Sequence, residues 1–188
     1  VPVDKNGTPL ALLDEFAENE NAMFFLWKDH AAAAEADEIN KLFRNNSEND
    51  YTKYQGDYSA EWYWAKILYA VRHDEAIRQA AYTWEEHCDW MTGILCGETR
   101  PEKIYHSACA AGHKALWHSE WGGLPAASVL EQLDPYLVQV RERYGNAPQP
   151  STVKVGTLCP EWAKKLGLKE STVISGSSFD AHAGAVGA

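Results

Sequence analysis

The sequence predicts a mixed protein in which helices predominate and short strands separate them. Apolar residues recur at helical spacing, as Val129, Leu133 and Leu137 do in one stretch. Two compact apolar runs, residues 22–27 and 172–174, are short enough to be buried strands. A hydrophobic content of 45% is sufficient for a sizeable core, and 188 residues suit one large domain or a part of a larger protein.

Five helices are predicted along the chain. Ser59 is suited to cap the start of one helix, with Glu61 favourable in its first turn, and Asp74 is suited to cap the next. The five helices are expected over residues 31–43, around Ala65, around Ile77, over residues 85–97 and over residues 125–143.

Turn residues mark the connections between these elements. Asn6-Gly7 is a strong signal for a two-residue hairpin between extended arms. Residues 45–56 are polar and are expected to form an exposed loop. Pro148 and Pro150 mark the connection back to a sheet.

The charge of the chain excludes two classes of partner. Seventeen basic and 27 acidic residues give a formal net charge of −10, which argues against nucleic acid or an anionic membrane as the main partner. No apolar run approaches the ~20 residues of a membrane helix, and no signal peptide is recognised. A cytoplasmic protein is therefore expected.

The histidines and cysteines do not predict a metal site. The histidines lack HxxxH or HExxH spacing, and the cysteines lack CxxC spacing, so reduced structural thiols are expected rather than disulfides or zinc. The chain also lacks a P-loop, a full GxGxxG pattern and a GxSxG elbow. The residues concerned are His30, His113, His118, His182, Cys88, Cys96, Cys109 and Cys159.

The two ends of the sequence indicate an internal fragment of a longer enzyme. The chain opens inside a hairpin arm with no preceding methionine. It stops at Gly187-Ala188, within a segment that is expected to become a helix.

The last residues of the chain carry a candidate catalytic carboxylate. After the predicted strand, Gly176, Ser177 and Ser178 form a turn of small residues that presents Asp180 at its tip. The residues that follow are nearly all small, as in a helix that packs against phosphates or another backbone. Asp180 in this place is suited to take a proton from a substrate hydroxyl, or simply to cap the helix that follows it.

Two further residues are candidates for a small-molecule site. Trp27 ends the first apolar run, directly before polar residues, and an indole in such a place either forms a wall of a binding site or packs in the core. Lys114 follows a run of small residues and offers three donors to the oxygens of a sugar, unless it is an ordinary surface lysine. The tryptophans expected on helices and in the core are Trp62, Trp64, Trp84, Trp90 and Trp162.

Four segments together resemble one family, the FGGY carbohydrate kinases. MFFLWKDH, residues 23–30, is similar to the sugar-wall motif Trp-x-Asp of that family, and residues 176–188 are similar to the segment that bears its catalytic aspartate. Residues 85–104 and 109–125 are similar to the segments between these two, and the resemblance runs over the whole chain. Ala31 and Cys96 depart from it, because threonine is common at both positions.

The resemblance implies an α/β protein with the actin-like, ribonuclease-H-like ATPase fold, in which two domains close over a cleft. Residues 1–188 would be an incomplete first domain, the sugar-binding domain, with many helices. ATP and Mg²⁺ would be the cofactors of the full-length enzyme. The first phosphate loop would precede Val1, and the second phosphate loop and the adenine pocket would follow Ala188. No cofactor would then be bound by this fragment, which alone would be inactive.

The resemblance also implies roles for single residues. Asp180 would be the general base, Lys114 would hydrogen-bond the oxygens of the sugar, Trp27 would pack on its apolar face, and Asp29 would orient the Trp27 loop. The substrate would be a ketopentose, L-ribulose, converted to L-ribulose 5-phosphate. The alternatives are a non-catalytic sugar-binding domain and another FGGY kinase of the xylulose or glycerol type. An apolar face left open by the missing parts would favour homo-oligomers.

Overall fold

The computed structural model describes all residues from Val1 to Ala188. Helices outnumber strands, as the sequence predicts. The elements are β1 (Pro2–Val3), the 3₁₀ turns η1 (Leu10–Leu12), η2 (Asp14–Phe16) and η3 (Glu20–Ala22), α1 (Ala33–Arg44), α2 (Tyr63–His73), α3 (Glu75–Ala80), β2 (Thr83–Trp84), α4 (His87–Cys96), α5 (Ala108–His113), η4 (Ser119–Trp121), α6 (Ala127–Leu133), α7 (Pro135–Glu142), β3 (Lys154–Thr157), α8 (Pro160–Leu166), β4 (Val173–Ser175) and α9 (Asp180–Gly187).

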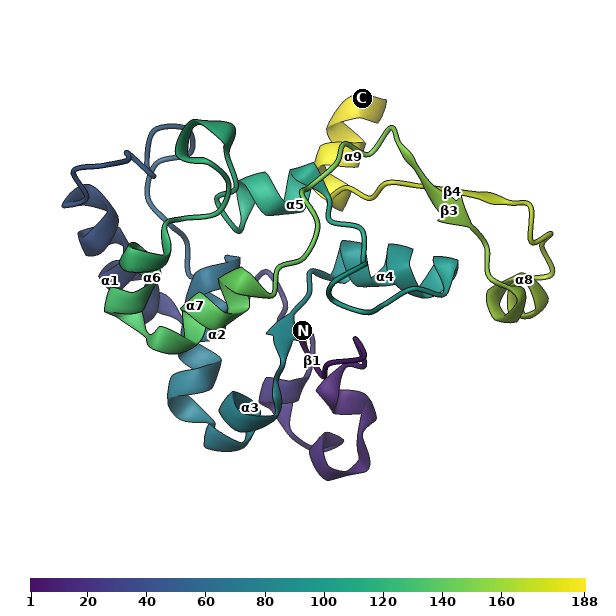
Figure 1. The fold of residues 1–188 in the computed structure, drawn as a ribbon, viewed down its shortest axis with the longest axis horizontal. Coiled ribbons are helices and arrows are strands. Elements are labelled where there is room, and N and C mark those ends of the chain that lie inside the picture. Colours follow the sequence, from purple (N-terminus) through teal and green to yellow (C-terminus); the bar gives the residue numbers. More distant parts are fainter.

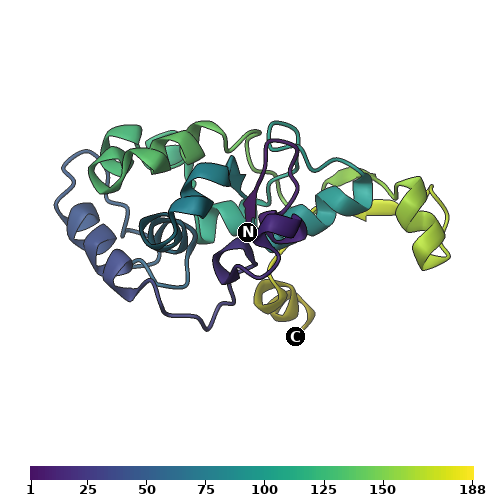
Figure 2. The ribbon, with the colours of Figure 1, turned by 90° about the horizontal axis from the view of Figure 1, so that it is seen from below.

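The molecule consists of a helical body and a protruding arm (Figure 1). The body contains α1, α2, α6 and α7, and the arm is the antiparallel β3–β4 hairpin with α8 at its tip. Viewed from below, α8 and α1 lie at opposite ends of the molecule, and α9 projects away from the body (Figure 2). A second two-stranded sheet pairs β1 with β2, with Pro2 opposite Trp84. No helix is both long and apolar enough to cross a bilayer.

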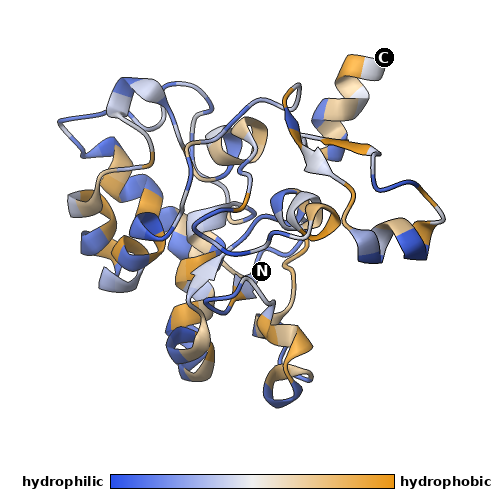
Figure 3. Cartoon of the chain, turned by 45° about the vertical axis from the view of Figure 1, so that its right-hand side comes forward, coloured by the Kyte–Doolittle hydropathy of each residue, from blue (hydrophilic) through white to orange (hydrophobic).

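Helix α2 is the centre of the core. Eight of its 11 residues are buried, and it packs against α1, α3 and α7. Hydrophobic and hydrophilic residues alternate along the surrounding helices (Figure 3). The buried residues of α1, α6 and α7 are mostly apolar. The indole nitrogen of Trp64 donates to the carbonyl oxygen of Ala115 at 2.9 Å, which joins α2 to the residues that follow α5.

The predicted cap of α2 is wrong, whereas the predicted cap of α3 is confirmed. The Ser59 hydroxyl accepts only from the Glu61 amide, and α2 begins four residues after Ser59, at Tyr63. The hydroxyl of Tyr58 accepts from the Trp64 amide at 2.9 Å and so satisfies one of the free donors in the first turn. Asp74 accepts from the Ile77 amide at the start of α3.

The single helix predicted over residues 125–143 is two helices, α6 and α7. The break falls at Asp134-Pro135, because proline has no amide for the helical ladder and its ring collides with the preceding turn. Asp134 caps α7 by accepting from the Tyr136 amide at 2.8 Å. Its carboxylate also pairs with both terminal nitrogens of Arg78, at 2.7 and 2.8 Å.

The strand predicted over residues 22–27 is absent. Ala22 ends a 3₁₀ turn and the following residues are irregular, because no neighbouring strand offers hydrogen bonds. The aromatic rings attach the segment instead. Phe24 packs edge-on against His87, and Phe25 stacks on Trp84.

The strand predicted over residues 172–174 is present as β4, but it is not buried. Val173 is 56% exposed, because β4 pairs only with β3 in the protruding arm. The tryptophans also depart from the prediction. Trp64 and Trp84 are buried, with Trp84 on a strand rather than a helix, whereas Trp62, Trp90 and Trp162 are only half-buried.

The remaining connections agree with the sequence in part. The Asn6-Gly7 turn is present, and the Asp4 carboxylate accepts from the amides of Asn6 and Thr8. The predicted two-residue hairpin between extended arms is wrong, because the turn is closed only by an isolated bridge between Val3 and Pro9 and is followed by η1. Gly7 has a φ of +80°, and a Cβ there would lie 1.8 Å from the carbonyl oxygen of Thr99. Residues 45–56 form a loop that Tyr51 anchors in the core. The four cysteines form no disulfide.

Replacement of the α7 cap should destabilise the fold measurably. Asp134→Ala removes both the cap and the Arg78 pair, and we expect a loss of about 1–2 kcal/mol in the free energy of unfolding. Asp134→Asn keeps an acceptor for the Tyr136 amide and should lose about half as much. Urea denaturation measures both. A loss below about 0.3 kcal/mol for Asp134→Ala would show that neither contact supports the α6–α7 corner.

Candidate functional site

One cavity brings together three side chains that the sequence singles out. It has a volume of about 440 Å³. Residues of α5 and α9 line it, and these two helices lie side by side at the edge of the helical body (Figure 1). Trp27, Lys114 and Asp180 all line it, although they come from distant parts of the sequence. Its other lining residues are Glu61, Trp62, His113, Phe179, Ala181 and His182.

Trp27 lies on an irregular loop and exposes most of its indole. The residue is 70% exposed and lines the cavity. Asp29 does not line the cavity. Its carboxylate accepts from the Ala31 amide at 2.9 Å and lies 3.1 Å from the ammonium of Lys66. These contacts join Asp29 to the loop backbone and to α2, and the role of orienting the Trp27 loop stays a prediction.

Lys66 is a site-supporting residue that the sequence does not reveal. It stands on α2 among core residues, and its side chain is only 7% exposed. Its ammonium donates to the backbone carbonyl oxygens of Leu26 and Asp29 as well as to the Asp29 carboxylate. Burial disfavours the charged form of Asp29, but the Ala31 amide and Lys66 outweigh it and lower the pKa of that carboxyl. The loop is therefore tied to the core through one buried cation.

Lys114 directly follows α5 and lines the cavity, and its side chain is 25% exposed. Its ammonium is 3.0 Å from a carboxylate oxygen of Glu86 and 4.5 Å from the centre of the Phe179 ring. Glu86 is itself largely buried. The sequence interpretation missed Glu86, because an acidic residue just before a helix is common for helix stability alone. The Glu86 carboxylate and the Phe179 ring hold the ammonium beside the cavity.

Asp180 is the first residue of α9, and its carboxylate is exposed. The turn from β4 through Gly176 presents it as predicted. Its side chain makes no hydrogen bond and no ion pair in the chain, and the residue in the cap position is Phe179. The alternative that Asp180 caps this helix therefore has no hydrogen bond to support it. The small residues that follow pack against nothing within these residues, because α9 is exposed throughout.

Two histidines border the same cavity. The rings of His113 and His182 are 5.5 Å apart, and Nδ1 of His182 lies 2.7 Å from Sγ of Cys109. Burial, the His182 ring and the Lys114 ammonium lower the pKa of His113, so its imidazole is neutral near pH 7 and can both donate and accept. The cavity thus combines apolar rings with a cation, a carboxylate and a neutral imidazole.

Removal of the Lys66 ammonium should release the loop that carries Trp27. Lys66→Met keeps the apolar stem, and we expect amide hydrogen exchange in residues 24–31 to become at least ten-fold faster. Exchange in α2 should stay slow, because that helix is buried through its other side chains. Lys41→Met, on the exposed side of α1, is the matched control. Equal exchange of the loop in Lys66→Met and in the unaltered chain would contradict the anchoring role.

Known proteins include relatives of this chain with similar sequences. No protein-family model matches it. It is 47% identical over 188 residues to a ribulokinase of Vibrio parahaemolyticus, and the alignment covers 100% of this chain and 33% of that relative. It is 35% identical over 184 residues to a ribulokinase of Shouchella clausii, and that alignment covers 97% of this chain and 32% of the relative. The chain therefore spans about a third of the length of the curated relatives it matches.

A solved structure shares the fold. The xylulose kinase of Bifidobacterium adolescentis superposes with a TM-score of 0.54 at 15% identity, over 80% of this chain and 32% of that one. At this identity the likeness concerns the fold only. It confirms the predicted actin-like α/β class. The chain is thus homologous over its whole length to about one third of a ribulokinase, and it shares its fold with a xylulose kinase.

Proposed function

We propose that the chain is part of the sugar-binding domain of a longer, cytoplasmic, ATP-dependent carbohydrate kinase. The reaction is the phosphorylation of L-ribulose to L-ribulose 5-phosphate, a step of arabinose catabolism. The names of the relatives support the reaction class and the substrate. The observation that carries the proposal is that Trp27, Lys114 and Asp180 line one cavity with the dimensions of a small-molecule site.

Each of the three residues has a separate role in this proposal. The Trp27 indole packs against the apolar face of the sugar, and the Lys114 ammonium donates to its oxygens. The Asp180 carboxylate accepts the proton of the primary hydroxyl of the sugar. The hydroxyl oxygen bonds to the γ-phosphorus of ATP, and the bridging oxygen leaves with ADP. Phosphoryl transfer has a loose transition state, so catalysis consists mostly of positioning and charge stabilisation.

ATP and Mg²⁺ are the proposed cofactors of the longer protein. No three His, Cys, Asp or Glu side chains of this chain are grouped so as to hold a metal ion. When bound, the metal ion neutralises charge on the phosphates of ATP.

Loss of the proposed base should abolish most of the turnover. Asp180→Asn keeps the size of the side chain and removes its basicity, so kcat of the full-length enzyme should fall by about 10²-fold or more. Binding of the sugar should weaken only modestly. Steady-state kinetics with ribulose measure both quantities, with the exposed Glu170→Gln as the control. A kcat within a few-fold of the unaltered enzyme would remove Asp180 from the mechanism.

Loss of the proposed sugar donor should act on substrate binding. Lys114→Ala should raise KM for the ketose by about ten- to a hundred-fold, the value of one charged hydrogen bond, with a much smaller change for ATP. Lys165→Ala is the matched control, because this side chain contacts only Glu161 and the Trp162 ring, both on α8. An equal rise in both KM values would contradict a direct contact with the sugar. The same assay with xylulose and glycerol separates the ribulose assignment from the other FGGY types.

A further inference from the structure

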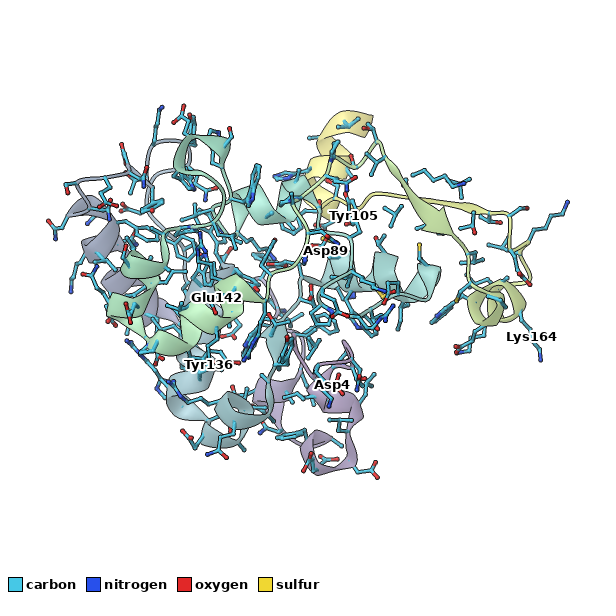
Figure 4. All side chains as sticks on the ribbon, in the orientation of Figure 1. Asp4, Asp89, Tyr105, Tyr136, Glu142 and Lys164 are labelled. Carbon is cyan, nitrogen blue, oxygen red and sulfur yellow. The ribbon has the colours of Figure 1, made fainter.

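A buried carboxylate outside the cavity connects two of the cavity's walls. Asp89 lies in the first turn of α4 and is 0% exposed, close to Tyr105 and to the chain that leads into α9 (Figure 4). One of its oxygens, Oδ1, accepts from the backbone amide of Ser107 at 2.9 Å and from the hydroxyl of Ser177 at 3.0 Å. The proposed reaction makes no direct use of this residue.

The first of these hydrogen bonds fixes the wall that carries Lys114. Ser107 is the residue before α5, and its hydroxyl accepts from the Cys109 amide to cap that helix. Helix α5 has only six residues and ends at His113, directly before Lys114. A helix this short depends on its ends for its position, since its own hydrogen bonds are few. Asp89 therefore sets where Lys114 stands.

The second hydrogen bond fixes the wall that carries Asp180. Ser177 lies three residues before Asp180, and its carbonyl oxygen also accepts from the Ser107 hydroxyl at 2.8 Å. The preceding residue, Gly176, is tightly enclosed. A Cβ there would lie 2.4 Å from the Tyr105 hydroxyl and 2.8 Å from the carbonyl oxygen of Pro150. The turn before the catalytic segment is therefore held on both sides.

The other oxygen of Asp89 faces a buried imidazole. Nδ1 of His106 lies 3.5 Å from Oδ2 of Asp89 and 3.8 Å from a carboxylate oxygen of Glu85. Burial alone would lower the pKa of His106, but Asp89 and Glu85 raise it above its ordinary value. Burial also raises the pKa of the Glu85 carboxyl to about 7. The imidazole thus compensates the charge that Asp89 would otherwise bury alone.

We propose that Asp89 is a positioning residue, which sets the distance between Lys114 and Asp180 through its hydrogen bonds to Ser107 and Ser177. It acts through these two serines and touches neither the sugar nor the transferred group. Its kinetic consequence depends on the proposed kinase function. The geometric claim, that Asp89 orders the segment before Asp180, does not.

The sharpest test removes only the link between Asp89 and the catalytic segment. Replacement of Asp89 itself risks unfolding, because it would leave His106 and the Ser107 amide without a partner. Ser177→Ala in the full-length protein deletes only the hydrogen bond from the Ser177 hydroxyl to Asp89. We expect kcat to fall about ten-fold, with KM for ketose and for ATP within about two-fold, because an ill-placed base affects the transition state more than binding.

Two further variants separate positioning from general stability. Ser177→Thr keeps a hydroxyl and should restore kcat to within about three-fold. Ser175→Ala removes an exposed hydroxyl that contacts only the next residue, and it should leave kcat unchanged. A merely structural role of Ser177 would lower Tm while leaving kcat of the folded enzyme as it was, and that result would overturn the proposal.

Hydrogen exchange gives a readout that is independent of kinase activity. Amides of residues 176–183 should exchange several-fold faster in Ser177→Ala and at the unaltered rate in Ser175→Ala. Faster amide exchange in Ser177→Ala, together with full activity of Asp180→Asn, would refute the proposed base and support the positioning role. Unchanged exchange and unchanged kcat in Ser177→Ala, together with an inactive Asp180→Asn, would overturn the positioning role and leave the proposed base standing.

Discussion

The position of the short helix α5 is the constraint on which the rest of the site depends. Its first end is held by the hydrogen bond from the Ser107 amide to the buried carboxylate of Asp89. At the other end, the hydroxyl of Tyr58 donates to the carbonyl oxygen of Lys114, and the Trp64 indole donates to that of Ala115. Because each of these bonds is buried or nearly so, its loss would leave a polar group without a partner. Helix α5 therefore presents Lys114 from a rigid base.

The contents of the cavity support the proposal of a polyol rather than an ionic ligand. Trp27, Trp62 and Phe179 supply apolar ring surface, which can cover the C–H face of a sugar. The Lys114 ammonium is already paired with Glu86, so it can donate hydrogen bonds without leaving an unbalanced positive charge in the cavity. The free carboxylate of Asp180 would repel an anion. Neutral hydroxyl groups are the partners that this combination favours.

The sequence predicts those features that local chemistry determines. Asp74 at the start of α3 and Gly97 at the end of α4 are recognised because a cap depends on residues within one turn. The prediction of a strand over residues 22–27 is wrong, since a short apolar run has the same pattern whether or not a partner strand exists. The break at Pro135 was accessible to sequence reasoning, because proline inside a helical pattern ends or kinks it. Lys66 and Asp89 could not be found, since their partners lie far away along the chain.

The central claim is that the cavity between α5 and α9 holds the sugar. A crystal structure of the full-length enzyme with a bound ketopentose tests this claim most directly. The account predicts density for the sugar between the Trp27 indole and the Lys114 ammonium, with its primary hydroxyl within hydrogen-bonding distance of the Asp180 carboxylate. Density for the ketose elsewhere in the protein, with this cavity holding only solvent, would contradict it.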